Sequence, residues 1–479
     1  MAWAIGAQDV SNALGTSVGS KAITVRQAIF IGAVCEFLGS LAGGSVAATI
    51  SGGILHVDLF ADMGPAGSVL LAMVFFCTMA GAFVWLALAT YWALPVSTTH
   101  SLIGSLVGIG MVLSHKLGEN AVQWDSVLRI VSSWVSSPVM GGVISYAVFA
   151  AIHHYVLKSH TPVAAARKAL PVITAATMGV LGVFLARTGP VQFRLTVPQA
   201  TLFGAVCGLA AFVYSFARPA NVLPSNPDPL SPMSSSSLSP DAVQLTDVEA
   251  GKPRLTARVA RTSSTADGGA ASTPTTPSRT EPGDDAVTPG GGVPQKKLHT
   301  PGGSPAVLQA QFLPLMVTTA CVVSFAHGSN DVSNAIGPFQ GIAEIYLYGH
   351  VAAASGATPL WILVCGGAGI VLGLATFGYK VMATVGEKIA KLSFSRGYAA
   401  QIACATTVLT ASQIGVSVST THCLIGAIAG VALVEGTDKL NYATLRKIGA
   451  SWVITLPASA LFAVVLFLVL SAERTPILM

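Results

Sequence analysis

Charged side chains are scarce in this sequence. Only 9% of its 479 residues are Asp, Glu, Lys or Arg, whereas an average soluble domain carries about 25%. Hydrophobic residues make up 52% of the chain, and the mean hydropathy is +0.68. The net charge is +5, and the few basic residues are spread thinly over short loops, which favours a membrane topology over nucleic-acid binding. The composition therefore predicts a polytopic membrane protein.

Cysteine spacings typical of metal sites are also absent. The seven cysteines stand singly, mostly within apolar runs, and we interpret them as small buried side chains. Apolar runs of roughly 20 residues, long enough to span a bilayer, recur along the chain and predict an all-α fold of about ten to twelve transmembrane helices, some of them broken. We expect the plasma membrane as the location, with an organellar membrane as the alternative, because no long N-terminal extension resembles a plastid transit peptide.

Residues 218–307 contain no Phe, Tyr or Trp and are rich in Ser, Pro, Thr and Gly. Such a composition buries too little apolar area to offset the chain entropy, so it predicts a disordered loop. This loop separates an N-terminal membrane repeat with its linking helices (1–217) from a C-terminal membrane repeat (308–479). The basic residues Arg167 and Lys168 lie in the loop two crossings earlier, so the positive-inside rule places both loops in the cytosol.

One polar motif occurs twice in apolar surroundings. The run Gly6-Ala-Gln-Asp-Val-Ser-Asn-Ala-Leu-Gly15 recurs in the second half of the chain as Gly328-Ser-Asn-Asp-Val-Ser-Asn-Ala-Ile-Gly337. Each copy places an Asp and an Asn on one helical face, Asp9 with Asn12 and Asp331 with Asn334. A carboxylate with an amide oxygen suits a sodium ion, and the carboxylate alone suits a proton. The glycines would let the helix unwind and expose carbonyl ligands. The alternative interpretation is a pair of helix-capping residues at the membrane edges.

A second polar motif, the hydroxyl cluster, is duplicated with the same offset along the chain as the acid motif. Each copy starts an apolar run with a Ser-Thr-Thr-His sequence, in which Ser is a favoured N-cap, so we expect each to begin a half-helix inside the membrane. Free N–H groups, the helix dipole and the hydroxyl donors suit an anion there. The alternative is a packing interface between helices. The clusters comprise Ser97, Thr98, Thr99, Ser419, Thr420 and Thr421.

The two duplicated motifs together predict a transporter. Polar residues inside a membrane are costly, so their repetition indicates function. Cation-binding acids beside anion-binding helix starts, in duplicated halves, are the layout of a secondary transporter, in which cations neutralise a charged anion. The second acid motif follows a long apolar run that starts at Leu313, whereas only Met1-Ala-Trp-Ala-Ile5 precedes the first. The duplication therefore predicts that the chain lacks most of its first membrane helix.

With these motifs the sequence resembles the inorganic phosphate transporter family, the sodium- or proton-coupled phosphate symporters. The acid motif is similar to that family's signature, and Pro95-Val-Ser-Thr-Thr-His100 is similar to its second hallmark. The resemblance implies two inverted repeats, no enzymatic activity, no cofactor, and a coupling ion that is Na⁺ or H⁺. The implied partners are inorganic phosphate and the lipid bilayer, with no nucleic acid, and a homodimer is one assembly to consider.

The resemblance also assigns roles to individual residues. It implies that Asp9 and Asp331 serve both phosphate and cation binding, that the hydroxyl clusters surround the phosphate, and that Glu36 joins the cation-binding set. The remaining cation-binding residues implied are Asn12 and Asn334.

This sequence departs from the family pattern at three places. Gln8 stands where the family has Asn, which would distort a cation site in the first repeat. Gln401 replaces a glutamate found in many members, which removes one negative charge. Ser417 precedes the second hydroxyl cluster in place of a proline, so we expect a softer helix break there than before the first.

Three other functions remain open from the sequence. A related oxyanion such as sulfate could be the substrate. The chain could instead act as a phosphate sensor that signals through the long loop and transports little. An intramembrane aspartyl protease would use Asp9 and Asp331 as its acid pair, but the usual motifs of such proteases are absent.

Overall fold

The computed structural model describes residues 1–187, 194–217, 305–349, 358–388 and 392–472. Within these ranges the chain is almost entirely helical, and an isolated β-bridge joins Leu55 and Val122. The predicted all-α fold is confirmed.

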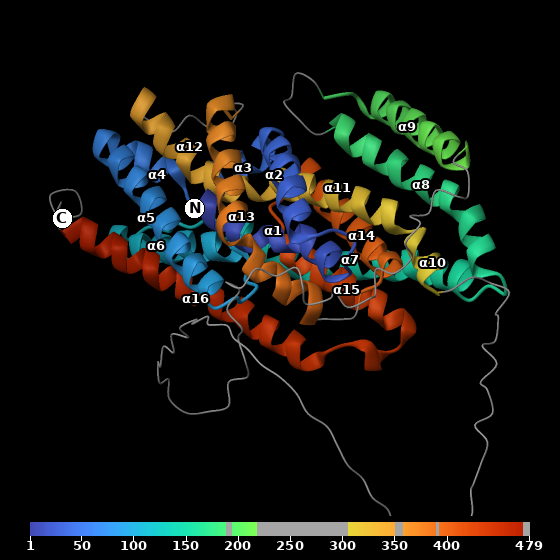
Figure 1. Ribbon diagram of the computed structural model, residues 1–479. Coiled ribbons are helices and arrows are strands. Elements are labelled where there is room, and N and C mark those ends of the chain that lie inside the picture. Colours follow the sequence, from blue (N-terminus) through green and yellow to red (C-terminus); the bar gives the residue numbers. More distant parts are fainter. Residues whose placement is uncertain (188–193, 218–304, 350–357, 389–391, 473–479) are drawn as a thin grey trace, which may run out of the picture. The chain divides into compact units, whose positions relative to one another are not determined.

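Figure 1 shows the helices packed along one another, with the N-terminal helix α1 among helices from the second half of the chain. In chain order they are α1 (Ala2–Gly19), α2 (Val25–Leu41), α3 (Gly44–Gly52), α4 (Val57–Asp62), α5 (Gly64–Tyr91), α6 (Thr98–Leu117), α7 (Trp124–Ile152) with the π-helix η1 (His153–Leu157), α8 (Pro162–Arg187), α9 (Val197–Ala217), α10 (Pro305–Ala310), α11 (Leu313–Asp331), α12 (Ser333–Tyr348), α13 (Leu360–Lys388), α14 (Phe394–Gln413), α15 (Thr420–Glu435), the 3₁₀ turn η3 (Thr437–Lys439) and α16 (Tyr442–Ala472).

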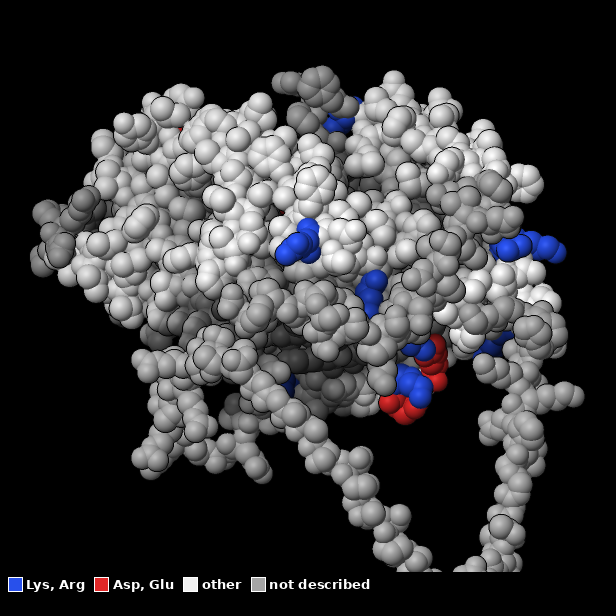
Figure 2. Space-filling model, in the orientation of Figure 1, with Lys and Arg blue, Asp and Glu red and all other residues white. Residues whose placement is uncertain are grey.

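Seven helical stretches of the described residues are long and apolar enough to cross a membrane, and α15 is a shorter apolar helix. Four other helices have at least 17 residues but are not long and apolar enough to count as membrane spans: α1, α2, α6 and α14. They carry buried polar side chains, which lower their hydropathy. Figure 2 shows a face that is mostly uncharged, with scattered Lys and Arg side chains and a small group of Asp and Glu side chains on its lower part.

Helix ends follow local sequence signals. At the start of α2, Gln27 N donates to Thr24 Oγ1 at 3.3 Å and Thr24 N donates to Gln27 Oε1 at 2.9 Å, which is a capping box. Gly118 ends α6 with φ 72° and Gly349 ends α12 with φ 78°. Glycine adopts this left-handed conformation without steric cost, so both residues act as helix stops.

The two halves of the chain pack against each other reciprocally. Helix α6 packs on α16, and its counterpart α15 packs on α7, the counterpart of α16. Hydrogen bonds repeat the exchange: Ser133 Oγ donates to Ser417 O at 3.3 Å, and Ser451 Oγ donates to Pro95 O at 3.3 Å. Positions 95 and 417 are related by the same offset as the duplicated motifs. This exchange of equivalent contacts supports a twofold relation between duplicated halves.

The helix breaks before the two hydroxyl clusters have the same length. Helix α5 ends at Tyr91 and α6 begins at Thr98, and α14 ends at Gln413 and α15 begins at Thr420. The expectation of a softer second break is therefore wrong. The physical reason is the backbone turn, because the equivalent residues Ala93 (φ 52°) and Gly415 (φ 73°) are both left-handed.

Gly6 of the acid motif and Gly373 of α13 allow close helix packing. A Cβ at Gly6 would lie 1.9 Å from Ile370 O of α13, and one at Gly373 would lie 1.9 Å from Trp3 O of α1. The expected unwinding at the glycines is wrong, since α1 is continuous through Gly6, and in the second copy the helix is interrupted at Val332.

Replacing Gly373 by Ala is expected to destabilise the protein by about 1–3 kcal/mol. The added methyl group would meet a backbone oxygen of α1, which cannot yield without separating the two helices. Gly449→Ala is the matched control, because a Cβ there meets nothing within 4 Å. The midpoint of thermal unfolding in detergent measures the effect, and equal midpoints for the two variants would contradict this account of the packing.

Two predictions about chain organisation remain untested. Most of the predicted loop, residues 218–304, lies outside the described part, although Pro305, Ala306 and Val307 already belong to α10. The proposed division into 1–217 and 308–479 stays a prediction. Of the cysteines, Cys77, Cys404 and Cys423 are buried as expected, whereas Cys365 is exposed.

Candidate functional site

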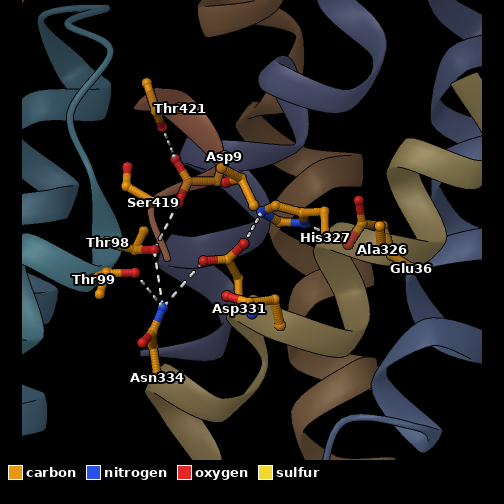
Figure 3. A network of polar contacts seen from close by, with 12 residues as sticks. Asp9, Glu36, Thr98, Thr99, Ala326, His327, Asp331, Asn334, Ser419 and Thr421 are labelled. Carbon is orange, nitrogen blue, oxygen red and sulfur yellow. Dashed lines mark hydrogen bonds and ion pairs between the residues drawn. The ribbon is translucent and has the colours of Figure 1, made fainter. Parts of the chain in front are cut away.

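The duplicated motifs meet in one buried cluster (Figure 3). Asp9 comes from the middle of α1 and Asp331 from the end of α11. Thr98 begins α6 and Thr421 lies in the first turn of α15. All four side chains are at most 2% exposed. Residues that are far apart in the sequence are therefore brought together as the internal repeat predicted.

The carboxylate of Asp9 is held by one hydroxyl from each half of the chain. Thr98 Oγ1 donates to Asp9 Oδ2 at 2.6 Å, and Thr421 Oγ1 donates to Asp9 Oδ1 at 3.3 Å. Asp9 therefore lies between the N-termini of α6 and α15, where hydroxyl donors and the helix dipoles stabilise negative charge. Its motif partner Asn12 lies on α1, but its side chain is outside the described part of the structure.

Asn334 links the second acid motif to the first hydroxyl cluster. Its Nδ2 group lies 3.2 Å from Asp331 Oδ1, 3.2 Å from Thr99 Oγ1 and 3.4 Å from Thr98 Oγ1, so its two N–H donors have three acceptors within reach. Its Oδ1 atom is buried without a hydrogen-bond partner. The amide oxygen predicted as a cation ligand is therefore available for one.

The two hydroxyl clusters begin helices in the predicted way. Ser97 caps α6 by accepting a hydrogen bond from His100 N at 3.3 Å, and Ser419 caps α15 by accepting one from His422 N at 3.3 Å. Thr99 Oγ1 donates to Val418 O at 3.5 Å. The predicted Ser N-caps are confirmed, and both capped helix N-termini lie beside the acids, whereas a start inside the membrane stays a prediction.

Of the six hydroxyls in the two clusters, that of Thr420 alone lacks a hydrogen bond of standard geometry. Its Oγ1 atom lies near the carboxyl group of Asp331 but makes no hydrogen bond of standard geometry, and the residue is 3% exposed. A buried polar group without a partner costs free energy. This hydroxyl is thus poised to donate to an anion in the site.

Sequence reasoning missed His327. It lies four residues before Asp331 on α11, and its Nε2 atom is 3.4 Å from Asp331 Oδ2. On its other side, Nδ1 is 2.6 Å from Glu36 Oε2. The available signal was its position one helical turn before Asp331, on the same face of the helix. Glu36 was predicted within the cation-binding set, and the structure places it against this histidine, with no exposed surface.

Gln8, the first departure from the family pattern, contacts the helix break that precedes the first hydroxyl cluster. Gln8 Nε2 donates to Leu94 O at 2.5 Å, and Thr90 Oγ1 donates to Gln8 Oε1 at 2.9 Å. The equivalent Asn330 donates to Ser412 Oγ at 2.9 Å, just before the second break. Each amide therefore forms hydrogen bonds next to the helix break that precedes the hydroxyl cluster of its own repeat.

Both polar atoms of the Gln401 side chain form hydrogen bonds with neighbouring residues. Its Nε2 donates to Thr16 Oγ1 at 2.8 Å and to Ser17 Oγ at 2.7 Å, and its Oε1 accepts from Thr319 Oγ1 at 2.8 Å. A glutamate at this position could bind a cation through its carboxylate, whereas Gln401 presents an N–H donor there. This position is a neutral contact between α14, α1 and α11.

The histidines that follow the hydroxyl clusters pack against tryptophans, His422 stacked on Trp452 and His100 tilted against Trp134. The ring centroids of His100 and Trp134 are 3.8 Å apart, those of His422 and Trp452 are 3.6 Å apart, and the two histidine rings are 4.6 Å apart. His422 Nδ1 lies 3.0 Å from Trp134 O. Within the described residues they show aromatic packing at the interface between the halves, next to the site.

The cluster holds more carboxyl groups than basic groups. Three buried carboxyl groups, of Asp9, Glu36 and Asp331, surround the single imidazole of His327 (Figure 3). Burying charge without compensation is expensive. The arrangement is therefore suited to take up cations, and with them an anion at the hydroxyl donors.

Known proteins resemble this chain over nearly its whole length. Residues 5–463 match the model of the phosphate transporter family. The chain is 36% identical over 469 residues to "Inorganic phosphate transporter 2-1, chloroplastic" of Arabidopsis thaliana, a match that covers 97% of this chain and 69% of the relative. It is also similar to a solved structure described as "The sodium-dependent phosphate transporter", with a TM-score of 0.75 and 30% identity, over 98% of this chain and 96% of that one.

Proposed function

This chain belongs to the phosphate transporter family, and on that premise we propose that sodium is the ion that drives its phosphate uptake. The protein is a membrane transporter that takes up inorganic phosphate by cation-coupled symport, and it is not an enzyme. The alternative of an intramembrane aspartyl protease is therefore excluded. The choice between plasma and organellar membrane stays a prediction, although the Arabidopsis relative is named as chloroplastic.

A single observation carries the proposed site: the acids of both repeats and the hydroxyl groups of both helix N-termini share one buried cluster. We assign the sodium sites to Asp9, Asn12, Asp331 and Asn334, with Glu36 acting behind them through His327. The phosphate lies among the six Ser and Thr hydroxyls of the two clusters. Oxygen ligands of carboxylate and amide type suit a hard cation such as sodium.

The hydrogen bonds indicate how cation and phosphate binding are linked. The Thr98 hydroxyl donates to the Asp9 carboxylate, and the Asn334 amide is within donating reach of the Asp331 carboxylate and of both threonines of the first cluster. A sodium ion at either carboxylate would replace these donors. The released hydroxyl and amide N–H groups would then bind phosphate, so an empty cation site leaves fewer donors for the anion.

Phosphate is favoured over sulfate by the same carboxylates. At neutral pH phosphate carries one or two protons and sulfate carries none. Asp9 and Asp331 can accept a hydrogen bond from a protonated phosphate, and a site built to bond a substrate O–H rejects an analogue that lacks it. The oxygens of unprotonated sulfate and of the two carboxylates are all hydrogen-bond acceptors, so no hydrogen bond could form between them.

Uptake of labelled phosphate into liposomes containing the purified protein tests the proposal. We expect an inward sodium gradient to drive accumulation, a pH gradient alone to fail, and arsenate but not excess sulfate to compete. Accumulation driven by a pH gradient without sodium would show that protons are the coupling ion. Competition by sulfate equal to that by arsenate would show a general oxyanion permease.

A further inference from the structure

We propose that Cys35 and Cys321 are a redox modification site, at which a hydroperoxide forms a reversible disulfide bond that stops phosphate uptake. Cys35 lies on α2 in the first half of the chain, and Cys321 lies on α11 in the second half. Their thiol groups form a hydrogen bond with each other. The effect on uptake rests on the proposed function, whereas formation of the disulfide does not.

Helices α2 and α11 approach each other closely one turn away from the two thiols. A Cβ at Gly39, four residues after Cys35, would collide with the backbone oxygen of Phe325, four residues after Cys321. The two contacts follow each other in the same direction on both helices, so the helices run in parallel there. A disulfide requires Cα atoms about 4.4–6.8 Å apart, and a small residue lets two helix backbones come that near. Gly39 therefore provides the packing that a disulfide between these helices needs.

The two thiols are also accessible to a small oxidant. Cys35 and Cys321 are both partly exposed, and oxidation of a cysteine depends on access to its sulfur. Cys404 and Cys423 are another pair of neighbouring thiols, but they are at most 1% exposed. Exposure therefore favours the pair between α2 and α11.

Hydrogen peroxide supplies the chemistry in two steps. One cysteine sulfur attacks a peroxide oxygen, the O–O bond breaks, and the products are a sulfenic acid and one water. The second sulfur attacks the sulfenic sulfur, the S–S bond forms as the S–O bond breaks, and the departing hydroxide takes the second thiol proton as water. The two thiols thus lose two electrons and the peroxide gains them. A dithiol reductant reverses the bond by thiol–disulfide exchange.

The disulfide would lie next to a contact that joins α2 to the transport site. Glu36 follows Cys35 directly, and its Oε2 atom is 2.6 Å from His327 Nδ1 of α11 (Figure 3). A covalent bond between the neighbouring turns would hold the two helices, and with them the two halves of the chain, in one arrangement. Since transport needs the halves to rearrange around the site, the oxidised protein should not complete the transport cycle.

Treatment of the purified full-length protein with hydrogen peroxide tests whether the disulfide forms. We expect a cross-linked peptide pair that contains Cys35 and Cys321, detected by mass spectrometry without reduction, and its loss after dithiothreitol. The variants Cys35→Ser and Cys321→Ser should not form it. Cys365→Ser, at an exposed cysteine of α13, is the matched control and should form it as the wild type does.

Uptake of labelled phosphate into liposomes tests the consequence. We expect uptake by wild-type protein and by Cys365→Ser to fall in proportion to the cross-linked fraction and to return after dithiothreitol. Cys35→Ser and Cys321→Ser should transport like the wild type before treatment, which also shows that they fold, and should keep that rate in peroxide.

Each outcome supports or overturns the site. Oxidised wild-type protein without the Cys35–Cys321 peptide pair, or a loss of uptake that persists in both serine variants, would overturn it. Cross-linked protein that transports at the full rate would overturn its effect on uptake. The peptide pair is detected without any transport measurement, so reduced protein that fails to take up phosphate with a sodium gradient refutes the proposed function alone.

Discussion

Sodium-driven phosphate uptake is expected to fall by roughly 150- to 4,000-fold when Asp331 is replaced by Asn, because removing one partner of a buried charge pair costs about 3–5 kcal/mol. The side chain is 1% exposed, beside Asn334 and His327. Asn has nearly the same shape but no charge, so the change removes the attraction for the cation while leaving the packing in place. Initial rates in proteoliposomes measure the effect.

The matched control for Asp331→Asn is the same change at Asp438. That residue lies in the exposed turn η3 and pairs with Lys439 at 2.8 Å, so Asp438→Asn should transport at the wild-type rate. Equal quantities of monodisperse protein in the liposomes show that the variant is folded. Normal sodium-driven uptake by Asp331→Asn would refute the role of this carboxylate in coupling.

Replacing Thr420 by Ala is expected to raise the half-saturating phosphate concentration by roughly 10- to 150-fold, which is the loss of one hydrogen bond to a charged group worth about 1.5–3 kcal/mol. The Thr420 hydroxyl is buried at the start of α15 and makes no hydrogen bond of standard geometry. The free protein therefore loses little when it is removed, and the cost falls on the bound anion. The sodium dependence at saturating phosphate should change much less.

Thr78→Ala is the matched control for Thr420→Ala. Its hydroxyl is equally buried and without a hydrogen-bond partner, but it lies within α5. We expect its phosphate half-saturation to equal that of the wild type. An unchanged half-saturation in Thr420→Ala, or an equal change in both variants, would argue against phosphate binding at the start of α15.

The repeat was readable from the sequence because the motifs keep their order and spacing. Identical offsets for Asp9 to Asp331 and for Ser97 to Ser419 required two related halves, and apolar run length required helices. The N-caps at Ser97 and Ser419 also followed from local chemistry, since a Ser before a helical run satisfies free N–H groups. These features depend on neighbours along the chain.

Features that depend on contacts distant in the sequence could not be read in this way. The glycines of the acid motif looked like points of unwinding, but Gly6 is needed for the approach of α13, which belongs to the other half of the chain. The role of His327 depends on its contact with Glu36 of α2, which is distant in the sequence and could not be predicted from neighbouring residues. Gln8 was expected to distort a cation site in the first repeat, and its contacts with Leu94 and Thr90 could not be read from the sequence.

Phosphate binding to the purified protein, measured by calorimetry in sodium and in choline buffer, tests the central claim most directly. If cations at Asp9 and Asp331 release the donors that bind phosphate, the affinity should be at least about tenfold higher in sodium, a coupling free energy of about 1.4 kcal/mol. By reciprocity, phosphate should raise the affinity for sodium by the same factor. Equal phosphate affinity in the two buffers would contradict a shared cation and anion site.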